Sequence, residues 1–530
     1  MSEKIFLLGD VDAIKTYVFE ALGLPQIRGG SQRLVECEEE VKRYVRQEGG
    51  KEIYCSGGGF LFKVPADKAQ KIKGEIERIY FACTQVATVT IVYEDATELP
   101  PPEPTALKIT DGWAERLVRA YQQAQQAGEF ARRTAFLAAR LREAKQQKTT
   151  APFIEAFPFG KRCDICGKRV AEYVVPYPDE TKRLCRVCFQ RHETGREARS
   201  EAFRAFAEDN KLPLKAQPAQ DLNELVESAR RSYLAFLYAD GNNIGSLLQK
   251  VKNEKEFKAL SEALKEGAQK ALFEALWEVC QRALKEEEVW PFEILNIGGD
   301  DVTLLIQAGY AWDVAVAFLQ HFEEHVRQEV EKRLRGWPES WPECITASVG
   351  IAIADAKHPV RYLAALAENL LKQAKKTAKD HNTSAIDFLW LPNAIAVTKA
   401  EMVTDQYQRG DLKLTARPYA LEQALTVQKA VEILSGWPRS LRHRWSEALE
   451  QGVWSSLSLI VYDLARRSRE QREEILEVLQ RLCPHASPPQ INPPLWWLDQ
   501  DHGCWRTALL DVLELAELQA MRPDVQEEGE

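Results

Sequence analysis

Two short apolar runs, at residues 4–10 and 233–240, each end on an aspartate, Asp10 in the first and Asp240 in the second. Four residues beyond each aspartate stands an isoleucine, and helical sequence follows. Apolar runs of this length, bounded by polar residues, predict buried strands. We therefore expect two strands, far apart in the chain, that carry a carboxylate at the same end.

A pair of apolar runs joined by a glycine-rich turn follows in both places, at residues 52–64 and 292–306. This pattern predicts a β-hairpin. Each hairpin leads into a helical pattern and then a further strand, at about 66–82 and 86–93 in the first copy and about 311–335 and 345–354 in the second. Both copies read β-α-β-β-α-β, the ferredoxin-like arrangement, so the sequence predicts a duplicated α+β domain.

The segments outside the two copies differ in character. Residues 106–148 predict helix, and a compact insert with four cysteines follows at 160–192. The second copy continues with a predicted helix at about 359–379 and a strand near 385–391, and from about residue 418 the pattern is helical throughout. We divide the chain into a first ferredoxin-like domain, a helical domain with the cysteine insert, a second ferredoxin-like domain and an all-α domain, at residues 1–105, 106–230, 231–415 and 416–530.

Composition narrows the class of protein. Hydrophobic residues make up 45% and charged residues 28%, as in ordinary globular proteins. No run of eighteen apolar residues occurs and the N-terminal apolar run is too short for a signal peptide, so we expect a cytoplasmic protein without membrane contact. A net charge of −9 argues against a protein that coats nucleic acid by itself. Eleven cysteines in 530 residues are no disulfide framework.

Four of the cysteines form two C-x2-C pairs, Cys163 with Cys166 and Cys185 with Cys188, separated by eighteen residues. A C-x2-C turn presents two thiolates from one tight loop, and Gly167 supplies the flexible position after the first pair. Four thiolates close the tetrahedral coordination sphere of Zn²⁺ and leave no open position for catalysis. The spacing therefore predicts a structural zinc site.

The turn of the second hairpin reads Gly298-Gly299-Asp300-Asp301. Its flanking runs are strongly apolar, so two adjacent carboxylates there cost desolvation free energy unless a cation compensates them. In a ferredoxin-like fold, Asp240 ends the strand beside this hairpin. Three such carboxylates suit two Mg²⁺ or Mn²⁺ ions that activate a hydroxyl and steady a leaving pyrophosphate. We predict nucleotidyl transfer at these aspartates, with Asp300 the favoured ligand if only one of the adjacent pair binds metal.

Two further features indicate a nucleotide substrate. The turn glycines allow a phosphate or ribose to approach the backbone closely. Lys372, Lys375 and Lys376, on the helix after the fourth strand, are candidates to meet a triphosphate, with a solvated helix face as the alternative.

In the first copy we align the same turn as Gly57-Gly58-Gly59-Phe60, which lacks the acids. We expect this turn to hold no pair of metals and to bind a nucleotide that it presents to the active copy.

Beyond these local patterns, the chain resembles a known family along its whole length. It resembles the large polymerase/cyclase subunit of type III CRISPR effector complexes. The motifs that carry the resemblance are DVDAIKTYVF, IRGGSQRL, CDIC with CRVC, YADGNNIG, NIGGDD, and LLKQAKKTAK before SAIDF.

The resemblance implies two palm domains, the first inactive, and an enzyme that joins ATP through 3′-to-5′ linkages into cyclic oligoadenylates when target RNA is bound. The family's metal-binding acids fall on the three aspartates named above. Its ATP-contacting turns fall on Gly57 to Gly59 and on Gly298 and Gly299, and the pair Asn242-Asn243 is a candidate for contacts to nucleotide or metal.

The resemblance also implies partners. The C-terminal helices of the family pack against the small subunit of a crRNA-bearing complex, and neighbouring subunits contact the first palm. Many members begin with an HD nuclease domain. This chain has no His-Asp dipeptide, and its first palm starts at Met1, so we expect no DNase activity from it.

Three alternatives stay open at this stage. The first is a diguanylate or class III-type nucleotide cyclase, which shares the palm fold but has a glutamate where this chain has Asp301. The second is a non-catalytic scaffold of a ribonucleoprotein. The third, within the enzyme hypothesis, is a linear or mixed adenylate conjugate as the product.

Overall fold

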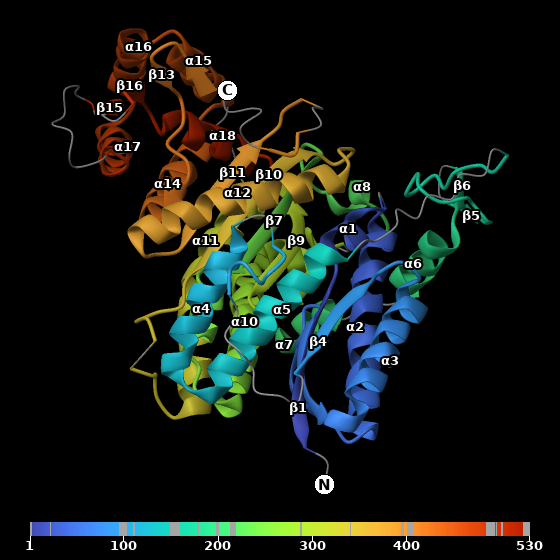
Figure 1. Ribbon diagram of the computed structural model, residues 1–530. Helices are drawn as coiled ribbons and strands as arrows, with labels where there is room; N and C mark the ends of the chain where they lie inside the picture. The colour runs from blue at the N-terminus through green and yellow to red at the C-terminus, as the bar shows by residue number, and fades with distance from the viewer. Residues whose placement is uncertain are drawn as a thin grey trace.

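The computed structural model of the chain describes most of the sequence, and Figure 1 shows how its elements are arranged. The described residues are 3–21, 23–94, 103–109, 112–148, 159–177, 180–197, 201–212, 219–286, 289–339, 341–393, 397–399, 407–483, 493, 495–499 and 502–522.

The first sheet has four strands in the order β2-β3-β1-β4, all antiparallel. Two long helices, α2 and α3, pack together beside it, and α5 lies against β1 and β4, where Phe6 meets Phe130 edge to face at 5.5 Å. The elements of this unit are β1 (Lys4–Val11), α1 (Ile14–Phe19), α2 (Leu24–Gln47), β2 (Lys51–Ser56), β3 (Gly59–Pro65), the 3-10 turn Ala66–Lys68, α3 (Ala69–Thr84) and β4 (Val89–Tyr93).

The second sheet has six strands in the order β14-β11-β10-β7-β9-β8. Its elements are β7 (Tyr233–Gly241), α9 (Ile244–Leu248), α10 (Glu254–Glu286), β8 (Phe292–Gly298), β9 (Asp301–Gln307), α11 (Ala308–Leu334), β10 (Ala347–Asp355), α12 (Val360–His381), β11 (Ala385–Trp390) and β14 (Tyr419–Ala420).

The two sheets share one strand order. In each, the first strand lies between the third and the fourth, and the second strand is at the edge. The second sheet adds β11, parallel to β10, and β14 beyond it. Because the first strand is antiparallel to the third, its C-terminal end lies next to the hairpin turn. The shared topology therefore places the two aspartates that end the predicted strands beside the two glycine turns.

A helical segment and a small β-hairpin separate the sheets in sequence. The predicted helix at 106–148 is two helices that break at Gly128, where φ is 119°. The elements between the sheets are α4 (Trp113–Ala127), α5 (Glu129–Gln147), β5 (Tyr173–Pro176), β6 (Thr181–Leu184), α6 (Arg186–Glu197), α7 (Glu201–Asp209) and α8 (Leu222–Leu225).

The C-terminal part departs from the all-α expectation, which is wrong. Five helices are present, but four short strands form a sheet in the order β12-β13-β16-β15. These strands are only two or three residues long, too short to show a hydrophobic alternation. The elements are β12 (Gln408–Arg409), β13 (Leu412–Lys413), α14 (Leu421–Ser435), α15 (Arg439–Glu450), α16 (Val453–Ala465), α17 (Arg469–Arg481), β15 (Trp497–Asp499), β16 (Cys504–Arg506) and α18 (Leu509–Gln519).

Helix α2 joins the two ferredoxin-like units. Its Arg28 makes a bidentate ion pair with Glu293 of β8, with both N–O distances 2.7 Å, and the two side chains are 4% and 2% exposed. Ser31 donates to the carbonyl of Leu295 at 2.6 Å. Gly29 packs so closely on α6 that a Cβ there would lie 1.9 Å from the Arg191 carbonyl oxygen. The IRGGS motif therefore fixes the first unit to the second and to α6.

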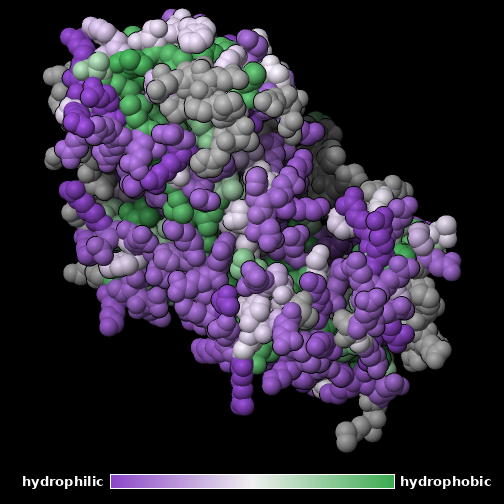
Figure 2. All heavy atoms as spheres, turned by 90° about the vertical axis from the view of Figure 1, so that its left-hand side faces the viewer, coloured by the Kyte–Doolittle hydropathy of each residue, from purple (hydrophilic) through white to green (hydrophobic). Residues whose placement is uncertain are grey.

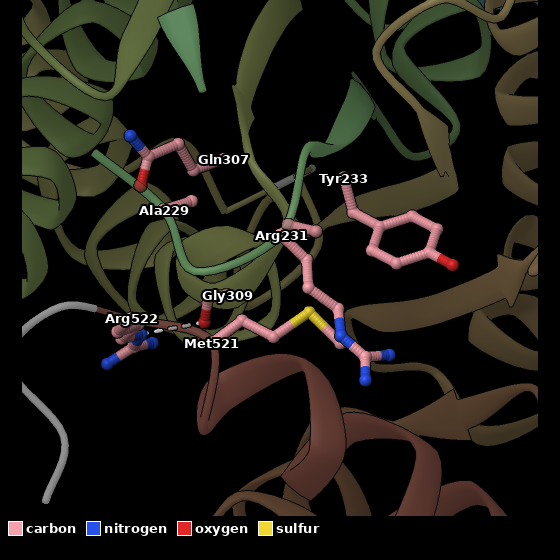
Figure 3. A pocket seen from close by; sticks show the side chains of 8 residues that line it. Ala229, Arg231, Tyr233, Gln307, Gly309, Met521 and Arg522 are labelled. Atoms are coloured by element: carbon pink, nitrogen blue, oxygen red, sulfur yellow. Dashed lines mark hydrogen bonds between the residues drawn. The ribbon is translucent and has the colours of Figure 1, made fainter. Parts of the chain in front are cut away.

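The last described residues, Met521 and Arg522, dock at the far end of the second sheet. In Figure 3, Arg522 reaches Gly309 at the start of α11 and donates to its carbonyl at 2.7 Å. The crevice drawn there is also lined by Tyr233 and Gln307, at the start of β7 and the end of β9. It therefore lies at the opposite end of these strands from Asp240.

The face shown in Figure 2 is mostly hydrophilic, and its largest hydrophobic area lies in the upper part, over the C-terminal elements at the top of Figure 1. None of the described helices combines the length and the apolar character that crossing a membrane requires.

Candidate active site

Three aspartates meet at one end of the second sheet. Asp240 is next to last in β7, Asp301 begins β9, and Asp300 lies in the turn just before it. The register pairs Ala239 with Val302, which places Asp240 and Asp301 opposite each other on antiparallel strands. The fold thus brings together the three carboxylates that the sequence indicated.

Two glycines make room for this arrangement. Gly299 adopts a φ of 78°, a left-handed conformation that costs a glycine little and lets the chain reverse within two residues. Gly241 follows Asp240 directly, and a Cβ at this position would lie 2.8 Å from Oδ2 of Asp300. Any larger residue at 241 would therefore push the Asp300 carboxylate away from β7.

Burial and neighbouring charge raise the pKa of Asp300 and Asp301. Burial, and then the charge of Asp240, raises the pKa of Asp300 from its ordinary value of 3.8 to about 7. Burial and the same neighbour, together with Asp300, raise the pKa of Asp301 well above its ordinary value. Tyr238, whose hydroxyl lies 3.5 Å from Oδ1 of Asp301, has a raised pKa because of burial and the nearby carboxylates. A divalent cation stabilises a group of partly desolvated carboxylates because it offsets their mutual repulsion.

Of the predicted lysines, Lys375 reaches the aspartates and Lys372 does not. The Lys375 ammonium of α12 forms an ion pair with Asp240 and donates to the Gly241 carbonyl at 2.9 Å. Lys372 pairs with Glu368 one turn back on its own helix at 2.9 Å, and its side chain is 67% exposed. The solvated helix face is thus the better description of Lys372.

A cation that the sequence analysis missed comes from the first unit. Lys15, on α1, lies 4.2 Å from the centre of the Tyr238 ring and 3.5 Å from Glu368. Its charge lowers the pKa of Asp301 against the larger effects that raise it. No local pattern identifies this lysine, because it approaches the site only through the packing of α1 on the second unit.

The two asparagines after β7 differ in role. Asn242 is held by β10: its amide donates to the Thr346 hydroxyl at 3.0 Å and its carbonyl accepts from Ser348 at 2.8 Å. Asn243 adopts a left-handed conformation with φ 56° and begins α9. Asn242 therefore positions the end of β7, and its side-chain amide and carbonyl already have protein partners.

The first unit repeats this framework. Lys145 of α5 forms an ion pair with Asp10, as Lys375 does with Asp240. Asp12 accepts from the hydroxyls of Thr88 at 2.8 Å and Thr90 at 2.7 Å, as Asn242 contacts the hydroxyls of Thr346 and Ser348. Burial raises the pKa of Asp10 despite the nearby ammonium of Lys145.

The first hairpin turn corrects our alignment by one residue. Strand β2 ends at Ser56 and β3 begins at Gly59, which pairs with Asp10. The residues that correspond to Gly298-Gly299-Asp300-Asp301 are therefore 56–59, with Gly58 and Gly59 in place of the acids. The three consecutive glycines carry no side-chain pattern that fixes this register. A Cβ on Gly58 would lie 2.1 Å from Ile14, so packing also leaves no room for an acid there.

The two glycine turns touch. A Cβ on Gly57 would lie 2.9 Å from the Gly298 carbonyl oxygen, and a Cβ on Gly298 would lie 3.0 Å from the Gly57 Cα. Tyr54 lies beside both turns, because it donates to the Ser56 carbonyl at 2.6 Å and its hydroxyl is 3.8 Å from the Cβ position of Gly299. The predicted nucleotide turns of the two units are therefore one continuous backbone surface.

The oxygen ligands of the three aspartates suit Mg²⁺ or Mn²⁺. Two other groups of described residues have at least three metal-ligand atoms within 4.8 Å of one another, and the aspartates are not among them. The Asp240 carboxylate instead forms an ion pair with the Lys375 ammonium. A metal ion at Asp240 would therefore compete with Lys375 for this carboxylate.

The first of those two groups is the predicted zinc site. The sulfurs of Cys163, Cys166, Cys185 and Cys188 all lie within 4.8 Å of one another, and all four cysteines are buried and free of disulfides. Gly167 has a φ of 66°, as the knuckle turn requires. Four converging thiols fit tetrahedral Zn²⁺.

The cysteine-bearing unit is anchored to the helix that carries Lys15. Glu20, just after α1, pairs with Arg169 at 3.1 Å, with Arg191 at 3.1 Å and with Lys168 at 3.3 Å. The glutamate side chain is 5% exposed, so these cations compensate a buried charge.

Comparison with known proteins places these residues in a family. The family model described as Cas10/Cmr2, second palm domain, matches residues 233–385, which include all three aspartates. No curated protein sequence matches the chain.

Solved structures resemble the chain in fold at low identity. A Csm1–Csm4 cassette in complex with pppApA has a TM-score of 0.50 and 13% identity over 97% of this chain and 69% of that chain. The cassette in complex with cA4 has a TM-score of 0.48 and 13% identity, and covers 98% and 70% of the two chains. Csm1 of T. onnurineus has a TM-score of 0.48, 14% identity and the same coverage. Residues 233–385 thus match the second palm domain of Cas10/Cmr2, and the chain shares its fold with the solved Csm1–Csm4 cassette.

Proposed function

We propose that the chain joins ATP molecules by 3′-to-5′ nucleotidyl transfer into cyclic oligoadenylates, as the large subunit of an RNA-activated complex in antiviral defence. One observation carries the proposal: the carboxylates of Asp240, Asp300 and Asp301 meet where the glycine turns of two ferredoxin-like units touch. In support, the solved cassette with the similar fold binds pppApA.

Asp240, Asp300 and Asp301 would hold two Mg²⁺ or Mn²⁺ ions, which supply activation of the attacking hydroxyl and neutralisation of the leaving pyrophosphate. Lys375, which pairs with Asp240, is the candidate side chain to contact the triphosphate. Lys15 adds positive charge from the first unit beside Asp301. The touching turns hold the two nucleotides side by side, which makes the transfer effectively intramolecular.

The first experiment measures products from ATP by mass spectrometry. The reconstituted complex with guide and matching RNA should form cyclic oligoadenylates, and the Asp300→Ala/Asp301→Ala variant should form none while still assembling. Turnover that persists in this variant would refute the site assignment. Assembly without any turnover of wild type would favour the scaffold alternative.

The same assay decides between the remaining alternatives. GTP supplied separately should give no product. Consumption of GTP would favour a diguanylate cyclase, and a cyclic mononucleotide formed from ATP would favour a class III-type cyclase. A linear or mixed adenylate product would differ from the cyclic one in mass.

We propose that the four cysteines bind structural Zn²⁺. Elemental analysis of the purified chain should find one zinc that resists dialysis, and Cys163→Ala/Cys166→Ala should lose it. Retention of that zinc in the variant would contradict the assignment.

We further propose the domain division at 1–105 (inactive first palm), 106–230 (helical domain with zinc), 231–415 (active palm) and 416–530 (C-terminal domain). The family match at 233–385 lies inside the third segment. The location consistent with this function is the cytoplasm, where crRNA and target RNA are present.

We propose that the C-terminal helices bind the small subunit of the complex. Trp454, Val461 and Tyr462 of α16 are 73%, 44% and 56% exposed, and a cavity of about 590 Å³ lies between α15 and α16. Apolar side chains exposed together mark interaction surfaces. Trp454→Ala/Tyr462→Ala should lose the small subunit from the complex while the contacts of the first palm with neighbouring subunits persist.

A further inference from the structure

The second group of converging metal-ligand atoms lies away from the aspartates, on the seam between α10 and α11. His321 and His325 are one turn apart on α11, and Glu274 and Glu278 are one turn apart on α10. Residues at this spacing share a helix face. The two pairs face each other across the seam, because His321 lies 2.9 Å from Glu278 and His325 lies 2.5 Å from Glu274.

One carboxylate lies between both imidazoles. Oε2 of Glu274 is 2.5 Å from Nε2 of His325 and 3.8 Å from Nδ1 of His321. One ligand atom from each of these three residues lies within 4.8 Å of the others. The side chains of His321 and His325 are 21% and 19% exposed, so packing partly orders their rings. The Glu274 side chain is 50% exposed, so its carboxylate faces solvent. An ion from solution can therefore reach the group.

The backbone at this seam is fixed. A Cβ on Gly267 of α10 would lie 2.8 Å from the Cα of Val326, the residue after His325, so the two helices are in close contact next to the group. Other acids along the seam pair with permanent cations: Glu329 lies 2.6 Å from Lys270, and Glu266 lies 2.6 Å from Arg333. At Glu274 the neighbours are instead imidazoles, which are metal ligands when neutral.

We propose that Glu274, His321 and His325, with Glu278 beside them, bind a divalent transition-metal ion of the Zn²⁺ class that links α10 to α11. Imidazole nitrogen with carboxylate oxygen suits Zn²⁺ and Ni²⁺, whereas Mg²⁺ prefers oxygen alone. Three protein ligands leave a position for water, so the site is exchangeable, unlike the closed group of four cysteines. The site is independent of the proposed nucleotidyl transfer.

The test uses the full chain, with zinc in the cysteine site and excess Mg²⁺ to occupy oxygen sites, and Ni²⁺ as the probe. Equilibrium dialysis should show one Ni²⁺ bound per wild-type chain and none in His321→Gln/His325→Gln. Ni²⁺ should also raise the midpoint of thermal unfolding of wild type and not of the variant, because it binds the folded state.

Two further variants keep the result interpretable. His443→Gln removes an exposed histidine of α15 that lies 3.6 Å from Glu447, one turn away on the same helix, and it should retain the ion. Glu274→Gln keeps both imidazoles and should weaken binding without changing the unfolding midpoint in metal-free buffer. Absence of Ni²⁺ uptake by wild type, or uptake unchanged in the double histidine variant, would overturn the proposal and leave these contacts as ordinary surface ion pairs.

Discussion

The two hairpin turns differ in charge although the framework around them is the same. Each is placed beside a strand-terminal aspartate that pairs with a lysine from a later helix, Asp10 with Lys145 and Asp240 with Lys375. The second turn adds two carboxylates, whereas glycines stand at both positions in the first.

The difference shows what a cation site requires beyond the fold. One carboxylate paired with one lysine is electrically satisfied, and it has no need of a divalent ion. Three carboxylates beside Lys375 are not, and burial together with their mutual repulsion raises the pKa of Asp300 and Asp301. Under the proposed function, the acids at two turn positions therefore distinguish the active unit from the inactive one.

Separation of the two units is expected to have the largest effect. Arg28→Ala leaves Glu293 as a buried, uncompensated charge and should destabilise the chain by about 3–5 kcal/mol in chemical denaturation. Because this pair joins the two units whose glycine turns touch, turnover should fall as well. Arg28→Met/Glu293→Leu is the control, since replacing both partners with apolar residues should recover most of the stability. Equal losses in the single and double variants would show that packing, not charge, holds the units.

A matched pair of substitutions tests the asymmetry of the two aspartates. Asp240→Asn should lower kcat for nucleotide transfer by about a hundredfold to a thousandfold, the range for removing one preorganised charged group. Asp10→Asn, in the same structural position, should change kcat by less than about tenfold. Steady-state kinetics with ATP measures both. Equal losses would show that the first unit also performs chemistry.

The raised pKa of Asp300 predicts a pH effect on stability in chelator. The folded protein retains a proton at Asp300 that the unfolded chain releases between about pH 4 and pH 7, since the pKa falls from about 7 to 3.8 on unfolding. Stability should therefore decrease as pH rises through this window. Asp300→Asn should flatten that slope and be more stable than wild type at pH 8 by on the order of 1 kcal/mol.

Thermal and denaturant unfolding at several pH values check this effect. Asp12→Asn is the control, because the pKa of Asp12 lies below its ordinary value of 3.8 and the stability linked to it titrates below this pH window. Its removal should leave the slope between pH 4 and pH 7 nearly unchanged. A wild-type stability that rises between pH 4 and pH 7 in proportion to Asp300 ionisation would contradict the prediction.

The smallest expected effect concerns the cation that crosses between units. Lys15→Met should lower kcat/KM by about twofold to fivefold at low ionic strength and by less in high salt, because Lys15 is 46% exposed and its charge is screened. Lys148→Met removes a lysine that donates to the Asp12 carboxylate of the first unit, and it should leave kcat/KM nearly unchanged. If both variants behave alike, the contribution of Lys15 is not specific to the active unit.

Parts of the molecule with local physical causes were predictable. The four cysteines of the proposed zinc site lie within a span of 26 residues, from Cys163 to Cys188, and each pair is fixed by its own turn. The strands that carry the aspartates are continuous apolar runs, and the strand order follows from the β-α-β-β-α-β pattern. In contrast, the C-terminal sheet joins β13 to β16, about 90 residues later in the chain, through pairs too short to leave a pattern.

The sequence by itself determined which residues carry chemistry, because carboxylates, thiols and turn glycines are identified by type and spacing. Only the tertiary structure decided which of them act together. It aligned residues 56–59 with the acidic turn, committed Asn242 to β10, and brought Lys15 to the second unit. The physical reason is that these contacts cross between segments more than 100 residues apart or depend on glycines without side chains, so no local pattern of apolar and polar positions records them.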